Sequence, residues 1–288
     1  MNIILKNIQL KFSIKDFSFL NIKIFNKIAQ NSICAILPLT IILIWYVLTA
    51  TETIRSNLLP PPQEVVNELL ILAHDGELLS HILITLNRVF YGFILGGFAA
   101  SILGIITGIS PTFRNLFDPT IQALKAVPSL AWVPLFILWF GIFENSKVAL
   151  ISVGVFFPIY LNLMMGIRQI DKKIIEVAHI NNLNHFQTIR WVLIPGIIPE
   201  WVTGLRSGLA LGWMFVIAAE LMGASEGLGY LMIDGQMTGR PALIIGALIL
   251  FAIAGKLSDQ LIYLLSLPFL KWKSSLNNMQ ERENHAQN

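Results

Sequence analysis

The chain has 288 residues, of which 55% are hydrophobic and 13% are charged, and its mean hydropathy is +0.68. A soluble domain carries about 25% charged residues, so these figures exclude an ordinary water-soluble enzyme and indicate a protein surrounded by lipid. The net charge of +3 does not indicate a nucleic-acid binder, because the basic residues lie beside apolar runs rather than on a polar face. The single cysteine, Cys34, excludes a disulfide framework and a zinc site made of cysteines, and we expect no metal and no cofactor.

Residues 1–32 precede the first long apolar run and contain five lysines. These lysines interrupt every stretch that could serve as the apolar region of a cleavable signal peptide, so we expect none. Two alternatives stay open for this segment: a disordered basic tail, or a helix on the cytoplasmic leaflet with its lysines toward anionic lipid.

Six apolar runs follow in the chain, and a membrane-crossing helix needs about 20 mostly apolar residues. The predicted spans are residues 33–50, 89–110, 126–142, 148–167, 201–222 and 242–267. The sequence therefore predicts an all-α polytopic membrane protein with six transmembrane helices. An even number of spans places both termini on one side, and that side holds fourteen Lys and Arg residues, including Lys125, against three on the other. Because basic residues concentrate on the cytoplasmic side, we expect both termini in the cytoplasm.

Small residues and prolines mark several of these spans. Small residues recur every four positions at Gly92, Gly96, Ala100, Gly104 and Gly108 and again at Gly204, Gly208 and Gly212. Such ridges let helix backbones approach closely in lipid, and they serve either plain packing or surfaces that slide during a transport cycle. Pro128 and Pro134 predict bends in the third span, and Pro158 predicts one in the fourth.

The loop of residues 168–195, between the fourth and fifth spans, is long and polar for a connection between helices. Its apolar residues suggest two short amphipathic helices, one around Ile174 and Ala178 and one around Phe186 and Trp191. An asparagine-rich turn separates them, since asparagine tolerates the left-handed conformation. We expect this exposed helix pair to dock into a groove on a partner.

The same loop resembles the signature of the inner-membrane subunits of bacterial ATP-binding-cassette (ABC) importers. That signature runs Glu-Ala-Ala, three residues, Gly, nine residues, Ile, one residue, Leu-Pro. Every spacing is kept here, in Glu176, Val177, Ala178, Asn182, Val192, Ile194 and Pro195. Val177 replaces an alanine and Asn182 replaces the glycine, and asparagine is the next best residue for a left-handed turn.

The resemblance extends from about residue 58 to residue 272. The similar segments are residues 59–62, 76–81, 137–142, 157–160, 166–168 and 227–231, and they look like the branch that carries aliphatic sulfonates, taurine, nitrate or bicarbonate. Within that branch, residues 254–259 are most similar to the alkanesulfonate permeases. The resemblance implies the type I importer permease fold.

The family implies a transport subunit rather than an enzyme. It implies a permease homodimer in membrane lipid, a cytoplasmic ABC ATPase that hydrolyses the ATP, and a periplasmic substrate-binding protein. The helix carrying Glu176, Val177 and Ala178 would couple to the ATPase, together with Asn182 and Pro195. We accordingly divide the chain into a cytoplasmic N-terminal tail (1–32), a first transmembrane helix with an outer loop (33–80), a core permease domain (81–267) with its coupling loop (168–195), and a cytoplasmic C-terminal tail (268–288).

Three other functions are less well supported by the sequence. Residues 223–227 match the G-x-S-x-G pattern of a hydrolase, but that elbow needs a preceding strand, and a membrane helix is predicted there. Gly255-Lys256 lacks the rest of a phosphate-binding loop, so the chain itself is not expected to split ATP. A secondary transporter driven by an ion gradient predicts inverted repeats and broken helices, and neither is clear in the sequence.

Ionisable residues inside the last two predicted spans are candidates for the transport pathway. Arg206 and Glu220 are weak candidates for substrate binding, and we favour a hydrogen-bonded Glu220 at the outer end of the bundle. Lys256 and Asp259 lie three residues apart on one helix face, and we expect them to neutralise each other.

Overall fold

The structure is a computed structural model that describes residues 36–221 and 223–286, and every regular element in these ranges is helical. It divides into two compact units, residues 1–64 and 65–288, which are described separately. The N-terminal tail expected at 1–32 and the first three residues of the first predicted span lie outside the described residues.

In the first unit, an apolar helix runs from Ile36 to Ala50. The indole Nε1 of Trp45 donates a hydrogen bond to the carbonyl oxygen of Pro60 at 2.9 Å. This bond fixes the chain where it leaves the helix, because it ties the proline-rich segment 59–62 back to the helix surface. The helix expected for the first span is therefore present over its described part.

The second unit is a bundle of helices joined by short connections. Its helices are α2 (Pro62–His74), α3 (Glu77–Ile109), α4 (Pro111–Lys125), α5 (Ser129–Phe140), α6 (Glu144–Arg168), α7 (Lys172–Ile180), α8 (His185–Thr188), η1 (Ile189–Leu193), α9 (Ile194–Leu221), α10 (Leu228–Met237) and α11 (Pro241–Ala286). Within the described residues, four helices are long and apolar enough to cross a membrane: α3, α6, the continuous helix Phe186–Leu221, and Pro241–Leu270 of α11.

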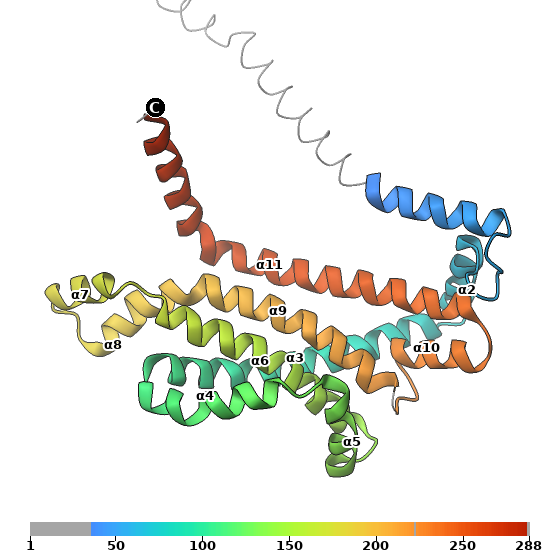
Figure 1. The fold of residues 1–288 in the computed structure, drawn as a ribbon, viewed down its shortest axis with the longest axis horizontal. Helices are drawn as coiled ribbons and strands as arrows, with labels where there is room; N and C mark the ends of the chain where they lie inside the picture. The colour runs from blue at the N-terminus through green and yellow to red at the C-terminus, as the bar shows by residue number, and fades with distance from the viewer. Residues whose placement is uncertain (1–35, 222, 287–288) are drawn as a thin grey trace, which may run out of the picture. The chain divides into compact units, whose positions relative to one another are not determined.

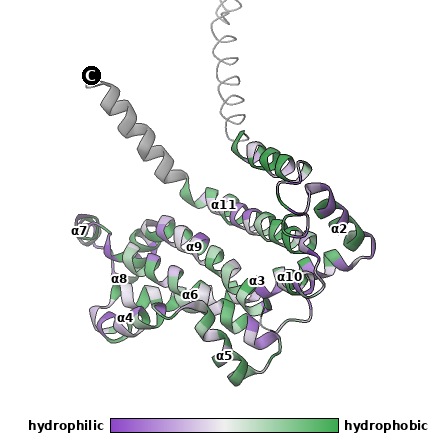
Figure 2. Ribbon diagram, turned by 45° about the vertical axis from the view of Figure 1, so that its right-hand side comes forward, coloured by the Kyte–Doolittle hydropathy of each residue, from purple (hydrophilic) through white to green (hydrophobic). Residues whose placement is uncertain are grey.

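The predicted third span is not one straight helix. α5 has only 12 residues, about 18 Å of helix, and α4 meets it at an angle of 106°. α4 mixes polar and apolar residues, whereas α5 is almost entirely apolar (Figure 2). Pro128 sits just before the first residue of α5, so it separates two helices where the sequence predicted a bend within one. Among the described residues, the helices long and apolar enough to span therefore number four, or five if this bent pair counts as one span.

α6 lies between α3 and α9, and the three helices run side by side (Figure 1). The glycine ridge of α3 faces α6, since a Cβ atom on Gly96 would collide with the backbone of Ser152 and one on Gly92 would lie 2.5 Å from Ile151. The ridge of α9 packs on the same helix, because Gly208 lies against Val155 and Ile159. Both ridges therefore allow close packing against α6.

We expect the variant Gly96→Ala to destabilise the bundle by about 1–3 kcal/mol, because its methyl group meets a backbone oxygen that cannot rotate away. The neighbouring variant Gly97→Ala is the control. A Cβ there would lie 3.4 Å from the Ile159 side chain, an ordinary contact. Thermal unfolding of the detergent-solubilised protein measures both variants, and an equal loss of stability in the two would contradict the assignment of the ridge.

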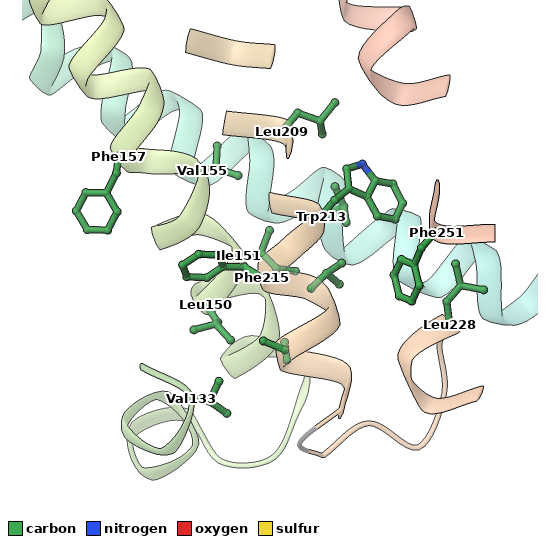
Figure 3. Close-up of a cluster of buried hydrophobic side chains, with 14 of the residues drawn as sticks. Val133, Leu150, Ile151, Val155, Phe157, Leu209, Trp213, Phe215, Leu228 and Phe251 are labelled. Carbon is green, nitrogen blue, oxygen red and sulfur yellow. The ribbon is translucent and has the colours of Figure 1, made fainter. Parts of the chain in front are cut away.

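The apolar core lies along α6 and α9 (Figure 3). Ile151 and Val155 of α6 are completely buried, and Phe215 of α9 packs beside them. Trp213 of α9 stacks edge-on against Phe251 of α11 with ring centroids 6.0 Å apart, which joins the last long helix to the core. The predicted sixth span is part of α11, which continues as helix to Ala286 through the segment expected to be a C-terminal tail.

Candidate functional site

The predicted coupling loop lies at one end of the bundle, where α7 and α8 extend beyond the ends of α6 and α9 (Figure 1). α7 ends in a left-handed turn at Asn182, whose φ is 57°. The amide of Leu183 donates to the carbonyl of Ala178 at 3.1 Å, which closes this turn over the last carbonyls of the helix. The expectation that Asn182 takes over the conformational role of a glycine is confirmed.

The second helix of the loop begins with a reciprocal cap. The amide of Gln187 donates to the Asn184 side chain at 2.8 Å, and the Asn184 amide donates back to the Gln187 side chain at 2.9 Å. The expectation of two separate short helices is wrong for the second, because α8 and the π-helical turn η1 run without a break into α9. Pro195 follows this turn after one residue, Ile194. Proline has no N–H for the carbonyl four residues earlier, and the wider turn accommodates the missing bond.

The surface of α7 is apolar where it faces away from the bundle. Val177 is 55% exposed, and Ile174 and Ile180, three residues away on either side, are also exposed. Ala178 is only 3% exposed, whereas Glu176 is exposed. Because Val177 points outward, its bulk relative to alanine displaces nothing inside the loop. The side chains of Glu176 and Val177 are thus free to touch a partner, while Ala178 and Asn182 fix the shape of the loop.

A second cluster lies near the start of α3 and α6 and the end of α9, and we call it the Arg88 network: His81, Thr85, Arg88, Glu144 and Glu220. The Arg88 guanidinium donates two hydrogen bonds to Glu144, at 2.6 and 2.7 Å, and one to Glu220 at 2.7 Å. Glu220 is completely buried and Arg88 is 4% exposed. Thr85 adds a hydrogen bond of 2.8 Å to Glu220. The expectation that Glu220 is hydrogen-bonded is confirmed, and its charged partner is Arg88.

The Arg88 network also holds the chain between α9 and α10. The amide of Gly229 donates to Glu220 at 2.8 Å, and the amide of Gly227 donates to the Nδ1 atom of His81 at 2.9 Å. Gly227 has a φ of 118°, and a Cβ on it would lie 2.6 Å from the Glu220 carboxylate. Only glycine therefore fits this close passage of the backbone over the ion pair.

The segment 223–227 that matches the hydrolase pattern forms no nucleophile elbow. Helix α9 precedes it, and the described residues around it contain no strand. The Nδ1 atom of His81 accepts a backbone hydrogen bond from Gly227, and the ring stacks on Tyr230. This histidine is therefore part of the fold rather than the base of a Ser225 nucleophile.

The other candidate for substrate binding, Arg206, also forms an ion pair within the protein. It donates two hydrogen bonds to Asp259 of α11, at 2.7 and 2.8 Å, and lies over the ring of Tyr263. The expectation that Lys256 neutralises Asp259 is wrong, because the bidentate guanidinium reaches Asp259 across the two helices and Lys256 does not. Contact of Arg206 or Glu220 with substrate stays a prediction.

A third ion pair joins α2 to the start of α11, between Glu68 and Arg240. The hydrogen bond to the Glu68 carboxylate raises the pKa of Arg240 above its usual value. This pair holds the amphipathic helix α2, which was not predicted from the sequence, beside the last long helix.

Residues 92–266 match the family described as the binding-protein-dependent transport system inner membrane component. The chain belongs to this family. It is the permease subunit of an ABC importer, a transport subunit of the inner membrane rather than an enzyme, in a system that also contains an ATPase and a substrate-binding protein. The matched range includes the whole loop of residues 168–195, which carries the signature described above.

Two relatives illustrate the branch to which this permease is similar. It is 39% identical over 240 residues to the aliphatic sulfonates transport permease protein SsuC of Bacillus subtilis, covering 83% of this chain and 87% of the relative. It is 33% identical over 217 residues to the taurine transport system permease protein TauC of Escherichia coli, covering 73% and 79%. The sulfonate and taurine branch expected from the sequence is therefore confirmed.

Among solved structures, this permease is similar to the MetNI methionine ABC transporter in an inward-facing conformation. The TM-score is 0.53 at 18% identity, covering 65% of this chain and 95% of the other. The likeness shows the type I permease fold.

Proposed function

We propose that the permease imports aliphatic sulfonates. The observation that carries this proposal is the difference in identity between its relatives, 39% to a sulfonate permease against 33% to a taurine permease. Taurine is itself a small sulfonate, so both relatives support the proposal that the substrate is an organic anion with a sulfonate group. Taurine, nitrate and bicarbonate are the alternative substrates.

We further propose that α7 is the coupling helix. Glu176 and Val177 would contact the ATPase, and Ala178, Asn182 and Pro195 would hold the loop in shape. The exposed apolar side chains of Ile174, Val177 and Ile180 support this, because such a face at the end of a bundle is suited to a groove on a partner. Movement of the ATPase subunits would then reach the bundle as a rigid-body displacement.

The proposed assembly is a homodimer of permeases with six spans each and both termini in the cytoplasm. The excess of Lys and Arg on the α7 side supports this orientation, with one amendment. Lys125 no longer belongs to that count, since it lies against the middle of α6 rather than beyond the end of a span. The boundaries of the four segments of the chain stay as proposed from the sequence.

The test is uptake by proteoliposomes that contain the permease, its ATPase and its binding protein. We expect uptake of an alkanesulfonate only when ATP is present on the side of the membrane that carries the ATPase. Nitrate and bicarbonate should not inhibit this uptake. Sulfonate flux by the permease alone, without ATP, would favour a secondary transporter. Uptake of nitrate but not of an alkanesulfonate would overturn the substrate assignment.

A further inference from the structure

A cavity of about 450 Å³ opens where α4 and α5 meet, against α6 and α9. Its volume is in the range of small-molecule sites, about 300–1,000 Å³. Its walls come from both sides of the α4–α5 break, from the middle of α6 and from the later part of α9, and they include Lys125, Phe157, Pro158, Leu161, Asn162 and Met214. Neither the family signature nor the Arg88 network involves this cavity.

The cavity lies at mid-depth in the bundle. Pro158 stands near the middle of the 25-residue helix α6, and Lys125 at the end of α4 lines the same space. The break between α4 and α5 thus brings a lysine to the depth of the centre of a spanning helix. Ionisable groups at that depth are costly, and they usually face a pathway or a water-filled space. None of the ion pairs formed by the described residues includes Lys125.

Asn162 supplies a second polar group to the cavity. One hydrogen of its amide is donated to the carbonyl oxygen of Pro158 at 2.8 Å. A side-chain amide has two hydrogens, and the second takes part in no hydrogen bond among the described residues. An ammonium group and an amide N–H are the donors that a sulfonate oxygen accepts from.

The rest of the wall is apolar. Phe157 and Leu161 come from α6 and Met214 from α9, and Met214 is half exposed. An inorganic anion such as nitrate has no apolar group to bury against this surface, whereas burial of an alkyl chain there is favourable. The flexible thioether of Met214 can adjust to chains of different length.

We propose that this cavity is a binding site in the transport pathway for an organic anion with an alkyl chain. The ammonium group of Lys125 and the amide of Asn162 bind the sulfonate, and Phe157, Leu161 and Met214 contact the chain. The assignment rests on the proposed function and narrows it to amphiphilic sulfonates over inorganic anions.

The first test compares two lysines at similar depth in the same reconstituted assembly. Lys125→Met should lower the rate of alkanesulfonate uptake at subsaturating substrate about tenfold, since it removes a charged hydrogen bond. Lys125→Arg, which keeps the charge, should restore most of the rate. Lys256→Met on α11 is the control, because Lys256 lines no part of this cavity, and it should stay within about twofold of wild type. Equal rates for Lys125→Met and Lys256→Met would overturn the site.

The second test does not depend on the lysine. Met214→Phe places a rigid ring against the apolar wall, and it should lower uptake of octanesulfonate about tenfold more than uptake of ethanesulfonate. Met165→Phe, on α6 but outside the cavity, should lower neither selectively. The same loss for both chain lengths in Met214→Phe would contradict contact with the alkyl chain.

The wild-type assembly separates the failure of this site from the failure of the proposed function. If wild type imports alkanesulfonates while Lys125→Met and Met214→Phe behave as their controls do, only the cavity assignment fails. If wild type imports an inorganic anion and no alkanesulfonate, both fail.

Discussion

Replacing Arg88 by methionine is expected to lower the free energy of unfolding by about 3–5 kcal/mol. The variant would leave Glu220, which is completely buried, without the cation that neutralises it. It would also remove both hydrogen bonds to Glu144 on α6. Thermal unfolding of the solubilised protein should show a fall in melting temperature of about 10 °C or more.

Two further variants make this expectation specific. In Arg88→Met/Glu220→Gln the buried charge is gone, and the glutamine oxygen can still accept from Thr85 or from the Gly229 amide but not from both, so we expect part of the stability to return. Arg240→Met breaks an ion pair that lies outside the spanning helices and whose side chains are 41% and 21% exposed, and it should cost at most about 1 kcal/mol. A double variant as unstable as Arg88→Met would show that the loss does not come from an unpaired Glu220.

Replacing Val177 by aspartate is expected to abolish most uptake, by about tenfold or more, while the amount of permease in the membrane stays near that of wild type. Val177 is exposed, so the aspartate is solvated in the free permease and the loop keeps its fold. On docking, the carboxylate would be buried against an apolar contact without a partner, which costs several kcal/mol. Uptake and ATP hydrolysis of the reconstituted importer measure the effect, and hydrolysis should no longer respond to the loaded binding protein.

The matched control for the loop is Val177→Ala, which keeps an apolar side chain at the position where the family signature has alanine. It should retain normal coupling. Ala178→Asp and Glu176→Lys should also uncouple, the first because it introduces a charge at a residue that is 3% exposed. Normal uptake in Val177→Asp would show that this face of α7 does not contact the ATPase.

The first helix and the turn of the loop 168–195 could be predicted because their information is local, whereas the continuation of the second helix into α9 could not. The residues around Ile174 and Ala178 predict a helix and the asparagines after it predict a left-handed turn, and φ at Asn182 agrees with the turn. The glycine ridges of α3 and α9 could also be predicted, because residues four positions apart lie on the same face of a helix, whichever helix packs against that face. Their common partner, α6, could not be read from the sequence.

The Arg88 network was missed because its partners are distant in the chain. Arg88 and Glu220 are 132 residues apart, and no local pattern states that they meet. A partial signal was present, since His81, Thr85 and Arg88 follow at intervals of four and three and share one face of an otherwise apolar helix. The break between α4 and α5 was missed for another reason. The run 126–142 is uniformly apolar, and whether Pro128 bends a helix or divides two depends on packing against α6 and α9.

Helix α6 connects the Arg88 network at one end of the bundle to α7 at the other end. Its first residue, Glu144, is bound by Arg88, and its last residue, Arg168, leads within four positions to α7. Closely packed helices on both flanks leave it little freedom to shift sideways. Its resistance to bending is lowest at Pro158, where one hydrogen bond is missing, and Pro158 lines the cavity of Lys125. A displacement of α7 would therefore be transmitted along α6 to Pro158, and a bend there would change the shape of the proposed substrate cavity.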